Sequence, residues 1–367
     1  MMDKHYYLDA NAHVPKRLGL SKKSKRILAD VENSYIAYGH PLSPNKLGKA
    51  ASAAIETARD RIAKCLNVNS HEIHFTRSCT EANALACKSL IAATWSPYEH
   101  HSMDAELHKQ FLSTTTIPVS KYGQPEFEKE TVNTVFVGVQ PEIGLIADFK
   151  TIRKNTRCFF VSDLAQAAGK LHLDLPSMGI DVATFGAHKF GGPLGVGFIY
   201  ANEPDFVDYK NMYEVSGYAQ DVPGTLSVVD VVETSLALQD SIANIDIKKE
   251  KCLKFRDKLE EGLESVGCKT ICKGQNRIYN TSFVRIPGED NGILLLKRLT
   301  DKNIHVGLGS ACGSFVIQES VVMQALGIND ANTSYIRISQ NGDYDDKDAE
   351  IVLNHIYKVL KEIGVKI

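Results

Sequence analysis

The sequence predicts an α/β fold in which helices surround an open sheet. Three observations favour it. Short apolar runs typical of buried strands recur within residues 159–200, an Ala-rich segment at 47–66 has helical periodicity, and residues 72–92 read as strand, turn and helix. In open α/β sheets, ligands bind beyond the carboxyl ends of the strands. Polar residues at those ends are therefore the first candidates for a functional site.

The remaining elements follow the same signals in chain order. Strands are expected at 6–8, 72–76, 135–139, 280–286, 305–306 and 335–339. Helices are expected at 21–31, 47–66, 78–92, 228–243, 245–266, 292–302, 321–326 and 346–363. The basic residues of the first helix are interpreted as a solvated face, with partner docking as the less favoured alternative.

Three strands are expected inside residues 159–200, and polar groups follow two of them. The run at 159–161 leads to Asp163, and the run at 181–185 leads to His188 and Lys189. A lysine amine can condense with the aldehyde of pyridoxal 5′-phosphate (PLP), and a carboxylate can keep its pyridine nitrogen protonated. A surface Asp and Lys beside a Gly-rich turn is the alternative. The paired patterns D-x-x-Q and H-K-x-x-G-P favour the cofactor.

This segment, together with the sequence GSACGS at 309–314, resembles the cysteine desulfurases of the class V aminotransferase-like, PLP-dependent enzymes. The resemblance runs from Tyr6 to about Ile338. It implies a fold type I PLP-dependent transferase, whose large domain has a mostly parallel sheet flanked by helices beside a smaller α+β domain. The large, PLP-binding domain is expected at 16–244. The small domain is expected at 1–15 and 245–367, where it carries the catalytic cysteine loop.

The turn between the strand at 72–76 and the following helix contains Ser78, Cys79 and Thr80. Free backbone N–H groups and the helix dipole converge there, which suits a phosphate. An ordinary Ser/Thr helix cap is the alternative. The resemblance places the cofactor phosphate at this turn.

The resemblance also assigns other site residues. His100, in a Glu-His-His-Ser segment, would stack on the cofactor ring and act as acid/base, with His101 as the fallback. The family's donor to the ring oxygen is replaced by Pro141, whose side chain cannot donate a hydrogen bond, so Gln166 is expected to take that role. His188 is expected at the cofactor and Asn11 near the substrate.

Cys312 and Arg337 carry the substrate chemistry in this resemblance. Lys189 would act as the base at the substrate α-carbon, and the Cys312 thiolate would attack the substrate sulfur. Arg337 would hold the substrate carboxylate through a two-point ion pair, with a surface strand arginine as the alternative. The separation in sequence between Cys312 and residues 325–327 is similar to that of the family subgroup with the longer catalytic loop. In that subgroup, the longer loop favours sulfur delivery to proteins.

A Pro-Gly-Thr sequence ending at Thr225 resembles a loop that reaches the partner's cofactor phosphate in dimers of the family, so a homodimer is expected. Several positions depart from the family pattern: His13, Val14, His40, Pro141, Gly186 and Val222. None of them is Asp163, Lys189, Cys312 or Arg337. The sequence therefore indicates an active but divergent enzyme.

Composition and net charge argue against several classes of protein. The 367 residues carry a net charge of −2, which implies no strong attraction to nucleic acid or anionic membranes. No apolar run is long enough to span a membrane, and the N-terminus lacks the apolar region of a secretory signal. Eight cysteines without C-x-x-C pairs favour reduced thiols, and a cytoplasmic protein without a metal site is expected.

The function expected from the resemblance is PLP-dependent cysteine desulfuration. L-Cysteine would yield L-alanine and a Cys312 persulfide, which a protein acceptor would receive for iron–sulfur cluster assembly or for RNA or DNA thiolation. The alternatives are a selenocysteine lyase, another class V aminotransferase-like enzyme and, less favoured, a non-catalytic scaffold. An aminotransferase does not need Cys312, and a scaffold does not need Lys189.

Overall fold

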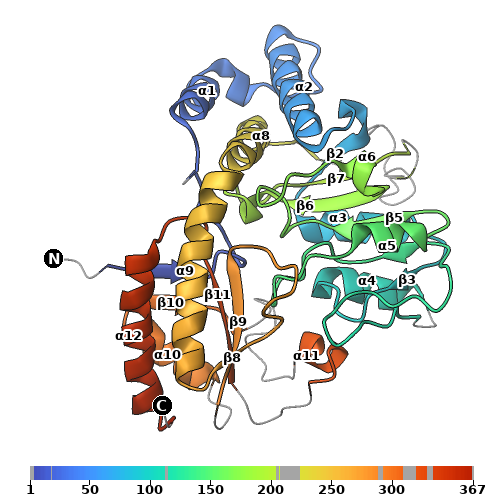
Figure 1. The fold of residues 1–367 in the computed structure, drawn as a ribbon. Helices are drawn as coiled ribbons and strands as arrows, with labels where there is room; N and C mark the ends of the chain where they lie inside the picture. Colours follow the sequence, from blue (N-terminus) through green and yellow to red (C-terminus); the bar gives the residue numbers. More distant parts are fainter. Residues whose placement is uncertain are drawn as a thin grey trace.

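The computed structural model describes residues 4–17, 19–111, 115–203, 206, 224–287, 292–308, 320–328 and 334–365. Two bodies of secondary structure lie side by side, a large sheet with its helices and a smaller group around α9 (Ile245–Ser265) and α12 (Asp346–Glu362) (Figure 1). The expected α/β class is confirmed.

The central sheet has six strands in the order β2-β7-β6-β5-β4-β3. Their bounds are β2 Ile73–Thr76, β3 Thr94–Trp95, β4 Thr134–Val135, β5 Phe160–Asp163, β6 Val182–Gly186 and β7 Gly197–Ala201. Strands β3 to β6 run parallel, whereas β7 is antiparallel to both β6 and β2. Because β5 and β6 are parallel neighbours with Asp163 opposite Thr184, their carboxyl ends meet at one edge.

Successive residues of the sheet point to opposite faces, and helices cover both. Phe160, Phe185 and Phe198 join the core that contains α2 (Lys46–Leu66) and α8 (Val228–Ala243). Val161 and Val182 join a separate core beneath α3 (Cys79–Lys88) and α4 (His101–Gln110). A parallel sheet buried on both faces explains why its strands read as continuous apolar runs.

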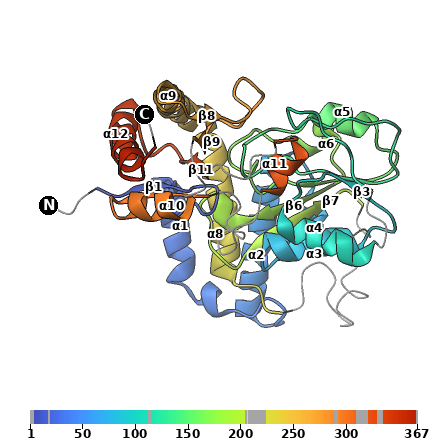
Figure 2. The same cartoon turned by 90° about the horizontal axis from the view of Figure 1, so that it is seen from below.

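The smaller body combines both ends of the chain. Strands β8 (Lys269–Thr270), β9 (Thr281–Ile286) and β11 (Ser334–Ser339) form an antiparallel sheet in the order β11-β9-β8. Near it, β1 (Tyr6–Leu8) pairs in parallel with β10 (Ile304–Val306). Helices α9 (Ile245–Ser265), α10 (Gly292–Thr300) and α12 (Asp346–Glu362) complete this body. Figure 2 shows β1 entering beside α10 and continuing toward the large sheet.

The remaining helices are short or peripheral. They are α1 Lys22–Glu32, η1 Tyr35–Tyr38, η2 Ser70–Glu72, α3 Cys79–Lys88, α4 His101–Gln110, α5 Phe149–Lys154, α6 Leu175–Met178, η3 Ala187–Lys189 and α11 Val321–Ala325. Although α11 lies between the small-body strands β10 and β11 in sequence, its residues Val322 and Met323 pack into the core of the large sheet. Within the described residues, no helix is long and apolar enough to cross a membrane.

Two elements are shorter than the sequence predicts. The helix expected at 78–92 ends at Lys88, where the N–H of Ser89 bonds back to the carbonyl of Leu85. The strand expected at 135–139 pairs regularly only at Thr134–Val135. Beyond it, Phe136 and Gly138 each donate one backbone hydrogen bond to β5 before Val139 pairs with Ile146. The apolar run at 135–139 therefore predicted burial correctly, but it overestimated the length of the regularly paired strand.

Candidate active site

Two strand ends bring the acidic and basic site residues together. Asp163 is the last residue of β5 and is 5% exposed, while Lys189 closes η3 directly after β6. Burying a carboxylate is costly unless other groups satisfy it. The Asp163 carboxylate accepts hydrogen bonds from the Asn83 side chain at 3.0 Å and from the Ala165 N–H at 2.9 Å.

Asn83 is the functional neighbour that sequence reasoning missed. Its Oδ1 accepts from the Thr184 hydroxyl, and its Nδ2 also donates to Ser102 Oγ at 2.9 Å. Because an ionised carboxylate only accepts, the NH₂ end of the amide faces Asp163 and its oxygen faces Thr184. In the sequence, the available signal was a single asparagine within the small, apolar residues 82–87 of α3.

The Lys189 amine lies against the backbone that follows β1. It donates to the carbonyl of Asn11 at 2.8 Å and to that of Ala12 at 3.1 Å. His188 and His13 lie beside it, with ring centroids 5.8 Å apart. Burial, and then the nearby Lys189, lower the pKa of His188 to about 4, and the same two causes lower the pKa of His13. Both imidazoles are therefore neutral near pH 7.

His100 caps the N-terminus of α4. Its Nδ1 accepts from the Ser102 N–H at 3.2 Å, so the ring proton belongs on Nε2. Burial lowers the pKa of His100, and the charge of Asp163 opposes that shift. His101, by contrast, is exposed on the first turn of α4. Of the two histidines considered from the sequence, the fold brings His100 toward Asp163.

The predicted phosphate turn lies at the start of α3. The Ser78 side chain accepts from the Glu81 N–H at 3.1 Å, as an ordinary cap does. The first N–H groups of the helix, including those of Cys79 and Thr80, have no intrahelical acceptors and remain suited to an anion. Cys79 Sγ lies 3.9 Å from Asp163 Oδ1, and burial raises its thiol pKa well above the ordinary value. Strand β7 passes so close that a Cβ at Gly197 would lie 2.5 Å from the Ser78 backbone.

Arg337 on β11 is 2% exposed and only partly satisfied. Its guanidinium donates to Asp9 Oδ1 at 2.7 Å and to the Pro141 carbonyl at 3.3 Å. Among the described residues, its buried Nε finds no hydrogen-bond partner, and neither does Nδ1 of His13. Buried donors and acceptors normally find partners, so these orphan atoms indicate that a polar molecule completes the site.

Asn11 and Gln166 are held by hydrogen bonds to neighbouring protein groups. The Asn11 amide donates to the Pro141 carbonyl at 3.0 Å and to Thr281 Oγ1 at 2.9 Å, and thus joins the two bodies. Gln166 donates to the Asn11 carbonyl at 2.8 Å and accepts from Lys170 at 2.6 Å. Lys170 is the second residue that sequence reasoning missed, although it lies one helical turn after Gln166.

One predicted site residue, Thr225, lies outside the Asp163–Lys189 cluster. The hydroxyl of Thr225 contacts Nε2 of His40 at 3.0 Å, and this contact is exposed rather than part of the Asp163–Lys189 cluster. Cys312 and Val222 fall outside the described residues.

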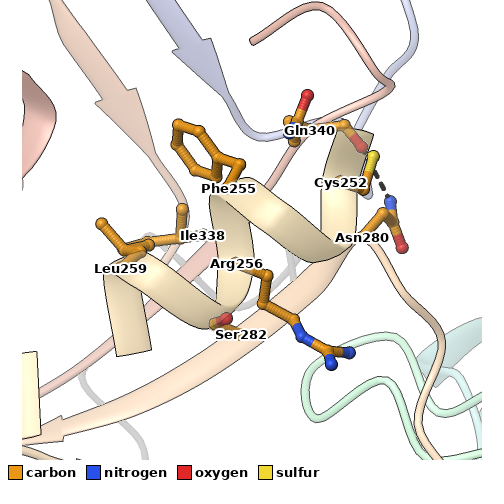
Figure 3. A pocket seen from close by; sticks show the side chains of 8 residues that line it. All are labelled: Cys252, Phe255, Arg256, Leu259, Asn280, Ser282, Ile338 and Gln340. Atoms are coloured by element: carbon orange, nitrogen blue, oxygen red, sulfur yellow. Dashed lines mark hydrogen bonds between the residues drawn. The ribbon is translucent and has the colours of Figure 1, made fainter. Parts of the chain in front are cut away.

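A small hollow in the smaller body is not a ligand site. It lies between α9 and strands β9 and β11 and encloses about 10 Å³, room for about one water molecule (Figure 3). Asn280, on its edge, donates to the Gln340 carbonyl at 3.0 Å and to Asn11 Oδ1 at 3.2 Å. The hollow therefore lies behind the packing that holds Asn11, away from Lys189.

The residues present fit PLP. The buried, hydrogen-bonded carboxylate of Asp163 can hold a protonated ring nitrogen, and the neighbouring amine of Lys189 can attach the aldehyde. The N-terminus of α3 can bind the phosphate. The orphan Nε of Arg337 leaves one donor for a substrate carboxylate.

The chain resembles known proteins in both sequence and fold. Residues 7–351 match the family described as Aminotransferase class-V. A protein named cysteine desulfurase IscS from Methanosarcina thermophila is 29% identical, with 98% of this chain and 93% of that protein covered. A solved NifS-like protein superposes with a TM-score of 0.84 at 22% identity, covering 98% and 100% of the two chains. A NifS-like protein from Rickettsia africae gives 0.82 at 24% identity over the same shares. These structures support the fold alone.

Proposed function

The chain belongs to the class V aminotransferase family, and from that premise we propose that it is a PLP-dependent cysteine desulfurase. The observation that carries the proposal is the pairing of buried Asp163 with Lys189 at adjoining strand ends. The cysteine desulfurases among its relatives support the choice of reaction. L-Cysteine would be converted to L-alanine, and the sulfur would pass to Cys312 as a persulfide.

PLP, when bound, supplies an acceptor for the electrons released at the substrate α-carbon. Asp163 would keep the ring nitrogen protonated, which strengthens that acceptor. Lys189 would attach the cofactor and then take and return the α-proton. Arg337 would bind the substrate carboxylate with its free Nε and an adjacent N–H. His100, with its proton on Nε2, would lie over the cofactor ring and serve as acid/base.

The cysteine inventory supports Cys312 as the nucleophile. The thiolate is the reactive form, and burial disfavours it. Six of the seven described cysteines are buried or partly buried, and burial raises the thiol pKa of each, to about 11 for Cys65 and Cys268 and to about 12 for Cys252. Cys158 is the exposed exception. The acceptor of the sulfur is proposed to be a protein. The free thiols support a reducing compartment such as the cytoplasm.

The proposed reaction is tested by supplying L-cysteine as the sole substrate to purified, PLP-loaded protein. L-Alanine is expected without any added keto acid, and the first turnover is expected to leave one sulfur atom on the protein. L-Selenocysteine is tested in parallel to distinguish a cysteine desulfurase from a selenocysteine lyase. A selenocysteine lyase would turn over L-selenocysteine in strong preference to L-cysteine. Amino-group transfer to a keto acid, with no alanine formed from L-cysteine, would overturn the proposal in favour of an aminotransferase.

We also propose a two-fold homodimer. Four exposed apolar side chains, here called the η1 patch, extend from η1 to the start of α2: Tyr35, Tyr38, Leu42 and Leu47. Tyr38 and Leu42 are 81% and 70% exposed, more than large apolar side chains of a monomer usually are when they cluster. His40, inside the patch, contacts Thr225, the residue expected to reach a partner's cofactor phosphate. A second copy of the chain would cover the patch and complete the phosphate site.

Sedimentation tests the dimer. The wild-type protein is expected to sediment as a dimer, and Tyr38→Glu combined with Leu42→Glu as a monomer that loses most of its bound PLP. Ile91→Glu is the matched control, because Ile91 is an equally exposed apolar residue at 94% outside the patch. A wild-type monomer with full PLP occupancy would contradict the proposal.

A further inference from the structure

Lys170 is a buried lysine that the proposed chemistry does not use. It is 3% exposed and lies on the turn that follows β5, four residues after Gln166. The turn is held from behind by α8, because Ser241 Oγ donates to the Gly169 carbonyl at 3.2 Å. In the described part of the chain its amine makes no salt bridge, and its hydrogen bond goes to Gln166 Oε1 at 2.6 Å. A buried ammonium without an acidic partner is costly, so such a residue calls for an explanation.

The charges around Lys170 are mostly cationic. Burial lowers its pKa well below the ordinary value, and Lys189, Lys248 and Arg337 lower it further, with only a weak opposing effect from Cys252. The Lys170 amine donates its hydrogen bond to Gln166 Oε1 at 2.6 Å. The side-chain oxygen of Gln166 is therefore occupied.

An amide whose oxygen is fixed presents its NH₂ group in one direction. Gln166 Nε2 donates to the Asn11 carbonyl at 2.8 Å, the same carbonyl that accepts from Lys189. A rotated amide would place its oxygen against the Asn11 carbonyl and its NH₂ group against the Lys170 amine, so both contacts oppose rotation. Without Lys170, only the Asn11 carbonyl holds the amide, so the direction of the Gln166 donor depends on Lys170 as well as on Asn11.

We propose that Lys170 is a positioning residue that locks the Gln166 amide so that its NH₂ group faces the cofactor ring oxygen. The inference rests on the proposed function, since it concerns the donor to bound PLP. A donor stabilises the negatively charged form of the ring oxygen, whereas an amide oxygen in its place would repel it. Pro141 offers no side-chain donor that could substitute for Gln166.

The test compares PLP binding and the visible absorbance of bound PLP across a set of variants. Lys170→Met is expected to raise the PLP dissociation constant about tenfold, about 1.4 kcal/mol. It is also expected to shift the midpoint of the pH-dependent absorbance change upward by about one pH unit, because the anionic oxygen loses its donor. Lys170→Gln keeps a donor and is expected to stay within about threefold of wild type.

Lys248→Met is the matched control. Lys248 is another of the cations that act on Lys170, but its amine binds Ser241 Oγ at 2.9 Å and Asn341 Oδ1 at 3.3 Å rather than Gln166. It removes a nearby charge without freeing the amide, so the midpoint is expected to stay close to wild type. Gln166→Leu with and without Lys170→Met then shows whether Lys170 acts through Gln166, because the double variant should be no worse than Gln166→Leu alone.

The outcomes separate the two levels of the proposal. If wild-type protein binds no PLP, the proposed function fails and the inference with it. If wild type binds PLP but Lys170→Met matches Lys248→Met, or if the Lys170 and Gln166 effects simply add, the inference alone is overturned.

Discussion

Replacing Lys189 with alanine is expected to abolish covalent attachment of PLP and to reduce alanine formation from L-cysteine by about 10²–10⁴-fold or more. The amine has two roles that no other described side chain shares in this position, since it both attaches the cofactor and moves the α-proton. Borohydride reduction of the wild type, followed by peptide mapping, is expected to fix the cofactor on Lys189.

The Lys189→Arg variant distinguishes loss of the reactive amine from loss of the hydrogen bonds that Lys189 makes. Arginine keeps a cationic donor for the Asn11 and Ala12 carbonyls, yet its guanidinium does not condense with an aldehyde. It is expected to be as inactive as the alanine variant. Lys88→Ala, which removes an exposed lysine from the end of α3, is the control and should retain both attachment and turnover. Reduced cofactor found on another lysine would show that the site is wrongly assigned.

Cys312→Ser is expected to retain PLP absorbance and melting temperature while alanine formation falls at least about 100-fold. The nucleophile acts after the cofactor is bound and after the α-proton has been removed, so its loss costs rate rather than fold. Mass spectrometry of the wild type after brief exposure to L-cysteine is expected to place one added sulfur atom on the peptide that contains Cys312.

Cys158→Ser is the matched control for this experiment, because Cys158 is the exposed cysteine of the described chain. It should leave turnover intact. Normal alanine formation by Cys312→Ser, or added sulfur only on the Cys158 peptide, would exclude the proposed route of sulfur transfer.

The sequence determined the strands of the site and the alignment of their ends. Apolar runs such as Phe160–Val161 report burial directly, because a sheet covered on both faces needs apolar residues at successive positions. Once two such runs are parallel neighbours, the polar residues after them must meet at one edge. Asp163 and Lys189 could therefore be paired before any contact was known.

Only the tertiary structure decided which groups surround that pair. Asn83 comes from α3 and Asn11 from the segment after β1, and nothing in the local pattern of either indicates a contact with β5 or η3. The resemblance preferred His100 to His101, but only the docking of α4 brings the His100 ring toward Asp163 and leaves His101 exposed.

Lys170 is the clearest case of this division. Its sequence position suggests a solvated lysine after a glycine, since lysines are rarely buried. Its burial follows from α8 packing over the turn, and its amine donates to the amide oxygen of Gln166. Local sequence encodes periodicity and turns, whereas the partner of a buried polar group is set by segments that meet only when the chain is folded.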